Sequence, residues 1–304
     1  MESEGYAMGH DHSHGHSQNK KALLISFLFI FTFMIVEVIG GIVTNSLALL
    51  SDAGHMLSDA AALGLSLAAF YIGEKASNKG KTYGYRRFEI LAAFLNGITL
   101  ILVSLYIFWE AYRRFIDTPD VSANMMIIAV IGLVVNILVA WILMRGDTEH
   151  NLNVRSAFLH VLGDMLGSVG AIIAGLLIYF FGWNLADPIA SIIVAILIII
   201  SGWRVTKDSI HILMEGSPRN VDTDQVKKGM STVQGVIEVH DLHVWCITSE
   251  FTALSCHVVV GDGVDRDEII QQLSRFLEDE YDIHHATLQV EGKHVLEGHH
   301  HCCT

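Results

Sequence analysis

The stretch LLSDAGHMLSDAA, Leu49–Ala61, places three ionisable side chains inside an apolar run long enough to form a membrane helix. They are Asp52, His55 and Asp59. A charged side chain near the middle of a bilayer is costly, so residues of this kind are rare there and usually face the interior of a helix bundle. The stretch therefore predicts a membrane protein that uses buried ionisable groups.

Hydrophobic residues are concentrated in the first two thirds of the chain. Of the 304 residues, 52% are hydrophobic and only 17% are charged, a low charged share for a soluble protein. A spanning helix needs about 20 mostly apolar residues, and six segments meet that requirement: residues 22–43, 46–73, 90–109, 121–144, 156–181 and 187–205. We predict an all-α six-helix transmembrane domain over residues 21–213, in contact with membrane lipid.

Lysine and arginine are unevenly distributed among the predicted connections. The side that carries both termini is rich in them, whereas the opposite connections hold only Arg113 and Arg114. Cytoplasmic loops carry an excess of Lys and Arg, so we expect both termini in the cytoplasm. The polar first 20 residues do not resemble a secretory signal, and an acidic chain without a targeting segment favours a bacterial plasma membrane.

The segment 214–293 has the pattern of a small soluble domain. Residues 222–233 and 265–281 are typical of capped helices, and residues 236–248, 250–260 and 285–291 alternate as strands do. The order α-β-β-α-β predicts a cytoplasmic α+β ferredoxin-like domain with both helices on one face of the sheet. From Glu215 onward the chain has 16 acidic and 6 basic residues, which suits cations and excludes nucleic acid as a partner. A domain this small has a limited core, so we expect a homodimer.

The pattern His-x-x-x-Asp occurs in two of the predicted spans, as His55–Asp59 and as His160–Asp164. Residues four apart share one helix face, so two facing helices would offer two imidazole nitrogens and two carboxylate oxygens, a tetrahedral shell for zinc. A single buried His or Asp could instead be a satisfied contact between helices, but two copies favour a metal site. Asp52 could be an outer ligand, a proton relay or a structural acceptor, and we favour the last.

The motifs SLALLSDAGHMLSDA, YGYRRFEILAAFLNG, HVLGDMLGSVG, DPIASIIVA and VHDLHVW together resemble those of the cation diffusion facilitators. The resemblance implies a homodimeric divalent-metal/proton antiporter with six spans and a cytoplasmic domain of metallochaperone-like shape. It further implies a zinc preference and transport ligands at His55, Asp59, His160 and Asp164.

The same resemblance implies a second metal site in the cytoplasmic domain, with His240, His257, His284 and Glu291 as ligands. His243 and His285 are further candidates, although any one histidine alone could be an ordinary sheet residue. We expect residues 1–20 and 294–304 to be disordered tails. GHDHSHGH and GHHHCCT within them are typical of metal-gathering segments, which makes Cys302 and Cys303 possible ligands; a tail that binds nothing is the alternative.

These patterns favour zinc efflux by Zn²⁺/H⁺ antiport through alternating access. Protons compete with metal for the same ligand atoms, and an unperturbed histidine has a pKa of about 6.5. A broader Zn/Cd/Co efflux transporter and a membrane-anchored zinc sensor are the alternatives. We do not expect an enzyme, because the H-E-x-x-H pattern of zinc proteases does not occur in the sequence.

Overall fold

The computed structural model describes residues 12–44, 47–116, 123–183 and 185–293. The chain divides into two compact units, residues 1–209 and 210–304. Each unit has its own hydrophobic core. The two units are described separately below.

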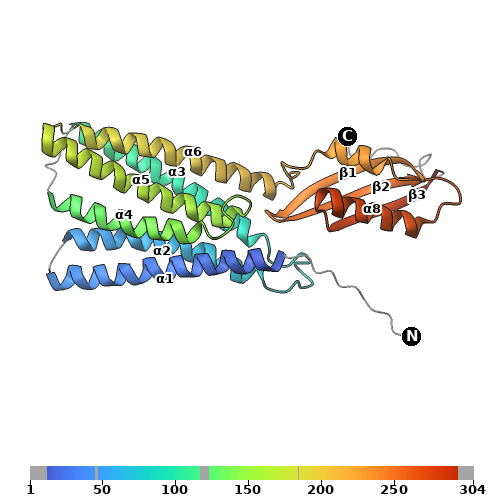
Figure 1. Ribbon diagram of the computed structural model, residues 1–304, viewed down its shortest axis with the longest axis horizontal. Coiled ribbons are helices and arrows are strands. Elements are labelled where there is room, and N and C mark those ends of the chain that lie inside the picture. The colour runs from blue at the N-terminus through green and yellow to red at the C-terminus, as the bar shows by residue number, and fades with distance from the viewer. Residues whose placement is uncertain (1–11, 45–46, 117–122, 184, 294–304) are drawn as a thin grey trace. The chain divides into compact units, whose positions relative to one another are not determined.

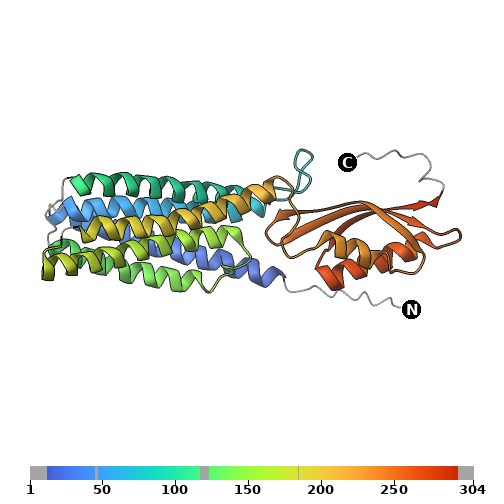
Figure 2. The same cartoon turned by 90° about the horizontal axis from the view of Figure 1, so that it is seen from above.

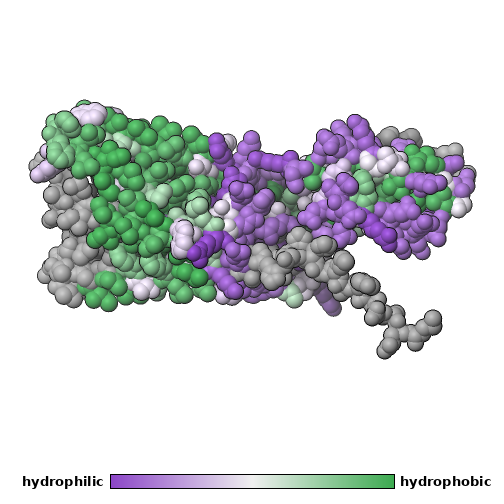
Figure 3. Space-filling model, in the orientation of Figure 1, coloured by the Kyte–Doolittle hydropathy of each residue, from purple (hydrophilic) through white to green (hydrophobic). Residues whose placement is uncertain are grey.

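The described residues of the first unit form six long helices, which lie alongside one another as a bundle (Figure 1). Their bounds are α1 His12–Thr44, α2 Leu47–Gly73, α3 Phe88–Ile116, α4 Ala123–Leu143, α5 Leu152–Phe181 and α6 Ala186–Leu213. Apolar residues cover most of the visible face of this bundle, and hydrophilic residues gather at the end where α1 begins (Figure 3). Leu102, Tyr106 and Trp109 on α3 are also exposed apolar residues. Such a surface suits contact with lipid, where a helix can satisfy all of its backbone groups internally.

Within the described residues, three helical segments are long and apolar enough to cross a membrane: Gln18–Val36, Phe88–Arg113 and Pro188–Leu213. Two shorter apolar helical segments, Asp59–Gly73 and Val130–Leu143, accompany them. The described residues therefore contain three candidate spans, and the expected count of six spans stays a prediction.

The first helix begins at His12, inside the segment that we expected to be a disordered tail. Three consecutive side chains explain why the helix persists up to the apolar run. Gln18 Nε2 donates to the Arg145 carbonyl at 2.5 Å, Asn19 Oδ1 accepts from the Asp147 amide at 2.6 Å, and Lys20 pairs with a Glu74 carboxylate at 2.6 Å. The helix range therefore corrects our tail boundary, and these contacts hold residues 18–20 of it in place; residues 1–11 lie outside the described part of the chain.

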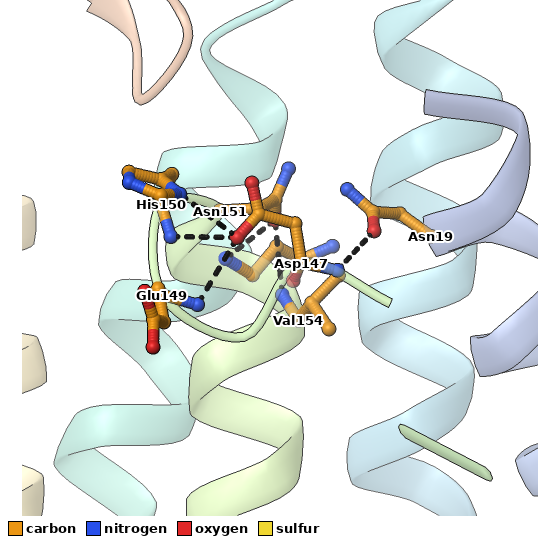
Figure 4. Close-up of polar contacts among 7 residues, drawn as sticks. Asn19, Asp147, Glu149, His150, Asn151 and Val154 are labelled. Atoms are coloured by element: carbon orange, nitrogen blue, oxygen red, sulfur yellow. Dashed lines mark hydrogen bonds and ion pairs between the residues drawn. The ribbon is translucent and has the colours of Figure 1, made fainter. Parts of the chain in front are cut away.

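The turn between α4 and α5 sets where α5 begins (Figure 4). Asp147 Oδ1 accepts from the amides of Glu149 and His150 at 3.1 and 2.9 Å. Asn151 Oδ1 then accepts from the Val154 amide at 3.0 Å, which satisfies one of the free N–H groups of the first helical turn. The capped start of α5 fixes the position, along the helix axis, of the side chains that follow it.

The second unit has the element order that the sequence predicts. Its elements are α7 Thr223–Met230, β1 Val236–Thr248, β2 Phe251–Val260, α8 Arg266–Tyr281 and β3 His285–Gly292. The sheet order is β1-β2-β3; β1 and β2 pair antiparallel, and β2 and β3 pair parallel across α8. Both helices lie on one face of this small mixed sheet (Figure 2).

Alternating residues of the strands build the core beneath these helices. Leu254, Cys256 and Val258 of β2 are buried with Leu273 and Leu277 of α8 in one cluster. Side chains alternate across a strand, so the neighbouring residue His257 points to the opposite face, which the helices leave open. That open face carries the second candidate metal site.

Candidate metal centres

Three side chains from α2 and α5 converge inside the helical unit. Asp59 Oδ1 lies 3.2 Å from His160 Nε2, and Asp164 Oδ2 lies 3.8 Å from the same nitrogen. One ligand atom from each residue can be chosen so that all three lie within 4.8 Å of one another. The side chains of Asp59, His160 and Asp164 are only 3%, 7% and 14% exposed, so this triad lies in the interior of the bundle.

Helical spacing accounts for this convergence. His160 and Asp164 are four residues apart on α5 and therefore share a face. Asp59 reaches them from the neighbouring helix α2, which runs past α5 with Asn153 Nδ2 donating to the Ser66 carbonyl at 2.8 Å. Small residues assist the packing: a Cβ on Gly163 would lie 3.2 Å from Ile198 of α6. One carboxylate from α2 thus meets an imidazole and a second carboxylate from α5 inside an apolar bundle.

His55, the fourth expected ligand, lies on α2 one turn before Asp59. Its side chain and that of Asp52 lie outside the described residues. The structure therefore brings together three of the four expected transport ligands, and the place of His55 in the set stays a prediction.

The second convergence lies on the open face of the sheet, where His240 of β1 and His257 of β2 are directly paired. Their ring centroids are 5.1 Å apart. Glu291 of β3 completes the group: its Oε1 lies 2.8 Å from His257 Nδ1, and its Oε2 lies 3.7 Å from His240 Nε2. Two nitrogens and a carboxylate within 4.8 Å of one another are a suitable partial shell for zinc.

A glutamine supports this second triad, and the sequence analysis missed it. Gln289 Nε2 donates to Glu291 Oε1 at 2.6 Å. Gln289 precedes Glu291 by two residues in β3, so strand alternation places both on one face. That spacing is the signal that could have identified it. The amide fixes the orientation of a carboxylate that is only 5% exposed, as outer partners of metal ligands commonly do.

The remaining cytoplasmic candidates lie elsewhere. His284 stands before β3, with Nδ1 3.2 Å from Glu278 and Nε2 2.8 Å from Asp282. His285 faces the ring of Phe251, with centroids 5.7 Å apart. His284 was expected as a ligand beside His240, but the described side chains of the triad do not include it. The αL conformation of Asp282, which ends α8, turns the chain before it reaches the sheet.

His243 lies near the second triad but outside it. Its Nε2 is 3.0 Å from Asp241 Oδ1, and Asp241 Oδ2 is 3.9 Å from His257 Nε2. A bulge between His240 and His243 shifts the register, and Asp241 takes a left-handed φ of 50° there. The bulge therefore places the Asp241 carboxylate between the imidazoles of His243 and His257.

The cysteines behave differently from these ligands. Burial raises the pKa of Cys256 to about 12 and also raises that of Cys246. The thiolate is the metal-binding form of cysteine, so these two thiols are poor ligands as the sheet is folded. Cys302 and Cys303 lie outside the described residues.

Comparison with known proteins now settles the family. Residues 23–214 match the family model described as a cation efflux transmembrane domain, and residues 218–293 match the one described as a cation efflux protein, cytoplasmic domain. The chain belongs to the cation efflux family. This confirms the resemblance to the cation diffusion facilitators. As a member, the chain is an integral membrane transporter of metal cations.

Relatives of this cation efflux protein are similar over most of its length. It is 56% identical over 274 residues to a cadmium, cobalt and zinc/H(+)-K(+) antiporter of Bacillus subtilis, covering 88% of this chain and 86% of the relative. It is 44% identical to the zinc transporter ZitB of Escherichia coli, covering 88% and 90%. The solved metal-bound C-terminal domain of the CzcD transporter of Cupriavidus metallidurans is 39% identical over 23% of this chain and 99% of that domain, with a TM-score of 0.23.

Proposed function

We propose that this protein exports zinc from the cytoplasm in exchange for protons, through His55, Asp59, His160 and Asp164. The observation that carries the proposal is the convergence of Asp59, His160 and Asp164 from two helices inside an apolar bundle. Two carboxylates would neutralise a divalent cation, which offsets the cost of placing its charge at that depth. The similarity to proteins named as a zinc transporter and as a cadmium, cobalt and zinc antiporter supports a metal substrate of this class.

The coupling to protons follows from the ligand chemistry. In the triad His160 Nε2 faces Asp59 at 3.2 Å, so a proton on that nitrogen would be donated to the carboxylate. Zinc requires that nitrogen without its proton. A proton and a metal ion are therefore alternative occupants of the same atoms, and exchange between them needs α2 and α5 to open first toward one side of the membrane and then toward the other.

The finer architecture belongs to the same proposal. It comprises six spans, both termini in the cytoplasm, a ferredoxin-like cytoplasmic domain, a homodimer and a bacterial plasma membrane. The excess of Lys and Arg on the terminal side supports the orientation. The mixed sheet with helices on one face supports the domain type. The family relationship, with bacterial relatives, supports the membrane.

We assign a second zinc ion to His240, His257 and Glu291 in the cytoplasmic domain. These side chains belong to three adjacent strands, so an ion bound there would cross-link the sheet. Occupancy of the site would then depend on the zinc concentration in the cytoplasm. Cadmium and cobalt remain substrates to test, because nitrogen and oxygen ligands alone separate them poorly from zinc.

The test is zinc uptake into inside-out vesicles that hold the purified protein and an internal pH dye. We expect zinc to enter while the lumen becomes more alkaline, and Asp59→Asn and Asp164→Asn to abolish both changes. Asp224→Asn, the same chemical change on the exposed face of α7, is the matched control. Zinc entry without a pH change would indicate a channel; full uptake by both aspartate variants would make the triad structural and favour a zinc sensor.

A further inference from the structure

A second polar layer lies on α2, α3 and α5, separate from both metal triads. Its side chains are Ser66, Asn96, Asn153 and Ser156, none more than 3% exposed. Asn153 Nδ2 donates to the Ser66 carbonyl at 2.8 Å, and Asn96 Nδ2 donates to Ser66 Oγ at 2.9 Å and reaches Ser156 Oγ at 3.4 Å. Three helices of an apolar bundle are thus joined by polar groups that lie away from water.

The layer lies in line with the transport triad. Ser66 follows Asp59 by seven residues on α2, and Asn153 precedes His160 by seven residues on α5. Seven residues are about two helical turns, or roughly 10 Å along the axis, and return to nearly the same face. The layer stands toward the end of the bundle that holds the α4–α5 turn, on the side rich in Lys and Arg that we assign to the cytoplasm.

One atom of the layer has its hydrogen-bonding capacity unused. Among the described residues, the buried Asn153 Oδ1 has no hydrogen-bond partner. Turning the amide over does not remove the problem, since the Ser66 carbonyl can only accept and requires Nδ2 to face it. A buried acceptor of this kind is uncommon and unfavourable, so its presence in a layer that also contains two hydroxyl groups suggests a function other than packing.

We propose that this layer is the cytoplasmic entrance of the transport route and that the structure holds it closed. When it opens, Asn153 releases the Ser66 carbonyl, and Asn153 Oδ1 with the hydroxyls of Ser66 and Ser156 receives the hydrated divalent cation on its way to Asp59 and His160. Neutral hydrogen bonds contribute little net stability once water can replace them, so a layer of this composition can open repeatedly. The proposal rests on the transport function stated above.

The alternative is that these hydrogen bonds are structural and hold α2, α3 and α5 together throughout the transport cycle. A cross-link distinguishes the two. In a full chain whose four cysteines are replaced by serine, Ser66→Cys and Asn153→Cys are combined and oxidised in zinc-loaded transport vesicles, with cross-linking measured by mass spectrometry. We expect oxidation to reduce zinc transport at least tenfold and a reductant to restore it. Each single cysteine variant, oxidised in the same way, should keep its own rate.

Reaction with a thiol reagent gives a second measurement that does not depend on forming the cross-link. A small charged methanethiosulfonate is added to the cytoplasmic face during zinc turnover, and we expect Asn153→Cys to react at least tenfold faster than Val139→Cys, a fully buried apolar position on α4. The entrance proposal would be overturned if the cross-linked protein still transported zinc. It would also be overturned if the cysteine at position 153 reacted with the reagent no faster than the cysteine at position 139. Failure of the unmodified protein to move zinc would instead reject the transport function.

Discussion

Changing Glu291 to glutamine tests the cytoplasmic metal centre with little change of shape. The carboxylate is 5% exposed and lies 2.8 Å from His257, 3.7 Å from His240 and 2.6 Å from the Gln289 amide. Glutamine retains one oxygen but loses the charge that a divalent ion would meet. We expect zinc binding at this site to weaken while the sheet stays folded.

The size of the effect follows from the ligand count. Structural zinc sites with four protein ligands provide about 10–16 kcal/mol of binding, or about 3 kcal/mol for each ligand. By that measure, losing Glu291 from the three ligands assigned here weakens zinc affinity about 100-fold. At a free zinc concentration about 100 times the wild-type Kd, bound zinc stabilises the folded unit by about 2.7 kcal/mol; in Glu291→Gln the same concentration equals the new Kd and contributes only about 0.4 kcal/mol.

Hydrogen exchange followed by mass spectrometry measures this locally in the full protein, without interference from zinc bound to the tails. Zinc should slow amide exchange in peptides from β1 and β3 about 100-fold in the wild type and about twofold in Glu291→Gln, since protection through local unfolding follows the same linkage. Glu280→Gln, on the exposed end of α8, is the matched control and should retain the wild-type response.

Two outcomes would refute this account. If Glu291→Gln keeps most of the zinc-dependent protection at the same free zinc, the carboxylate is not a ligand. If its peptides exchange fast even without zinc while those of Glu280→Gln do not, the carboxylate holds the sheet together by itself, and the metal argument fails at this residue.

Three further predictions concern packing and the buried thiol. Gly202→Ala should destabilise the helical unit by about 1–3 kcal/mol through overpacking, because the new Cβ would lie 3.0 Å from the Gly97 carbonyl oxygen; thermal unfolding in detergent, with Gly167→Ala as a control that meets no atom within 4 Å, checks this. Leu273→Ala, at a fully buried site of the sheet core, should cost the cytoplasmic unit about 2–5 kcal/mol, measured by urea-dependent hydrogen exchange; a cost below 1 kcal/mol would contradict the assigned core. Cys256 should resist alkylation at pH 8 in the folded protein and react after unfolding, because burial raises its pKa to about 12 and only the thiolate attacks; rapid native-state labelling would contradict that burial.

The helices and strands of this protein were largely predictable from local sequence. Asp222 and Asp265 cap α7 and α8 where the pattern placed them, because an aspartate side chain satisfies free amides of the first turn without any distant partner. The pairing of His160 with Asp164 is equally local, since it depends only on the helical repeat. The start of α1 was misplaced because the contacts that hold residues 18–20 come from Glu74 and the α4–α5 turn.

The sequence by itself determined the family, the apolar helical segments, the order of the elements in the second unit and the residue types from which a metal site could be built. Only the tertiary structure decided which of these residues meet. His240 meets His257 because the strand register pairs them directly, and Glu291 reaches both from β3, two residues beyond the register partner of His257. His284, by contrast, is held by Glu278 and Asp282 before the strand begins. Asn153 reaches Ser66 across 87 residues of sequence. Such contacts depend on how whole helices and strands pack, and the spacing of residues along one element carries no information about the register of another.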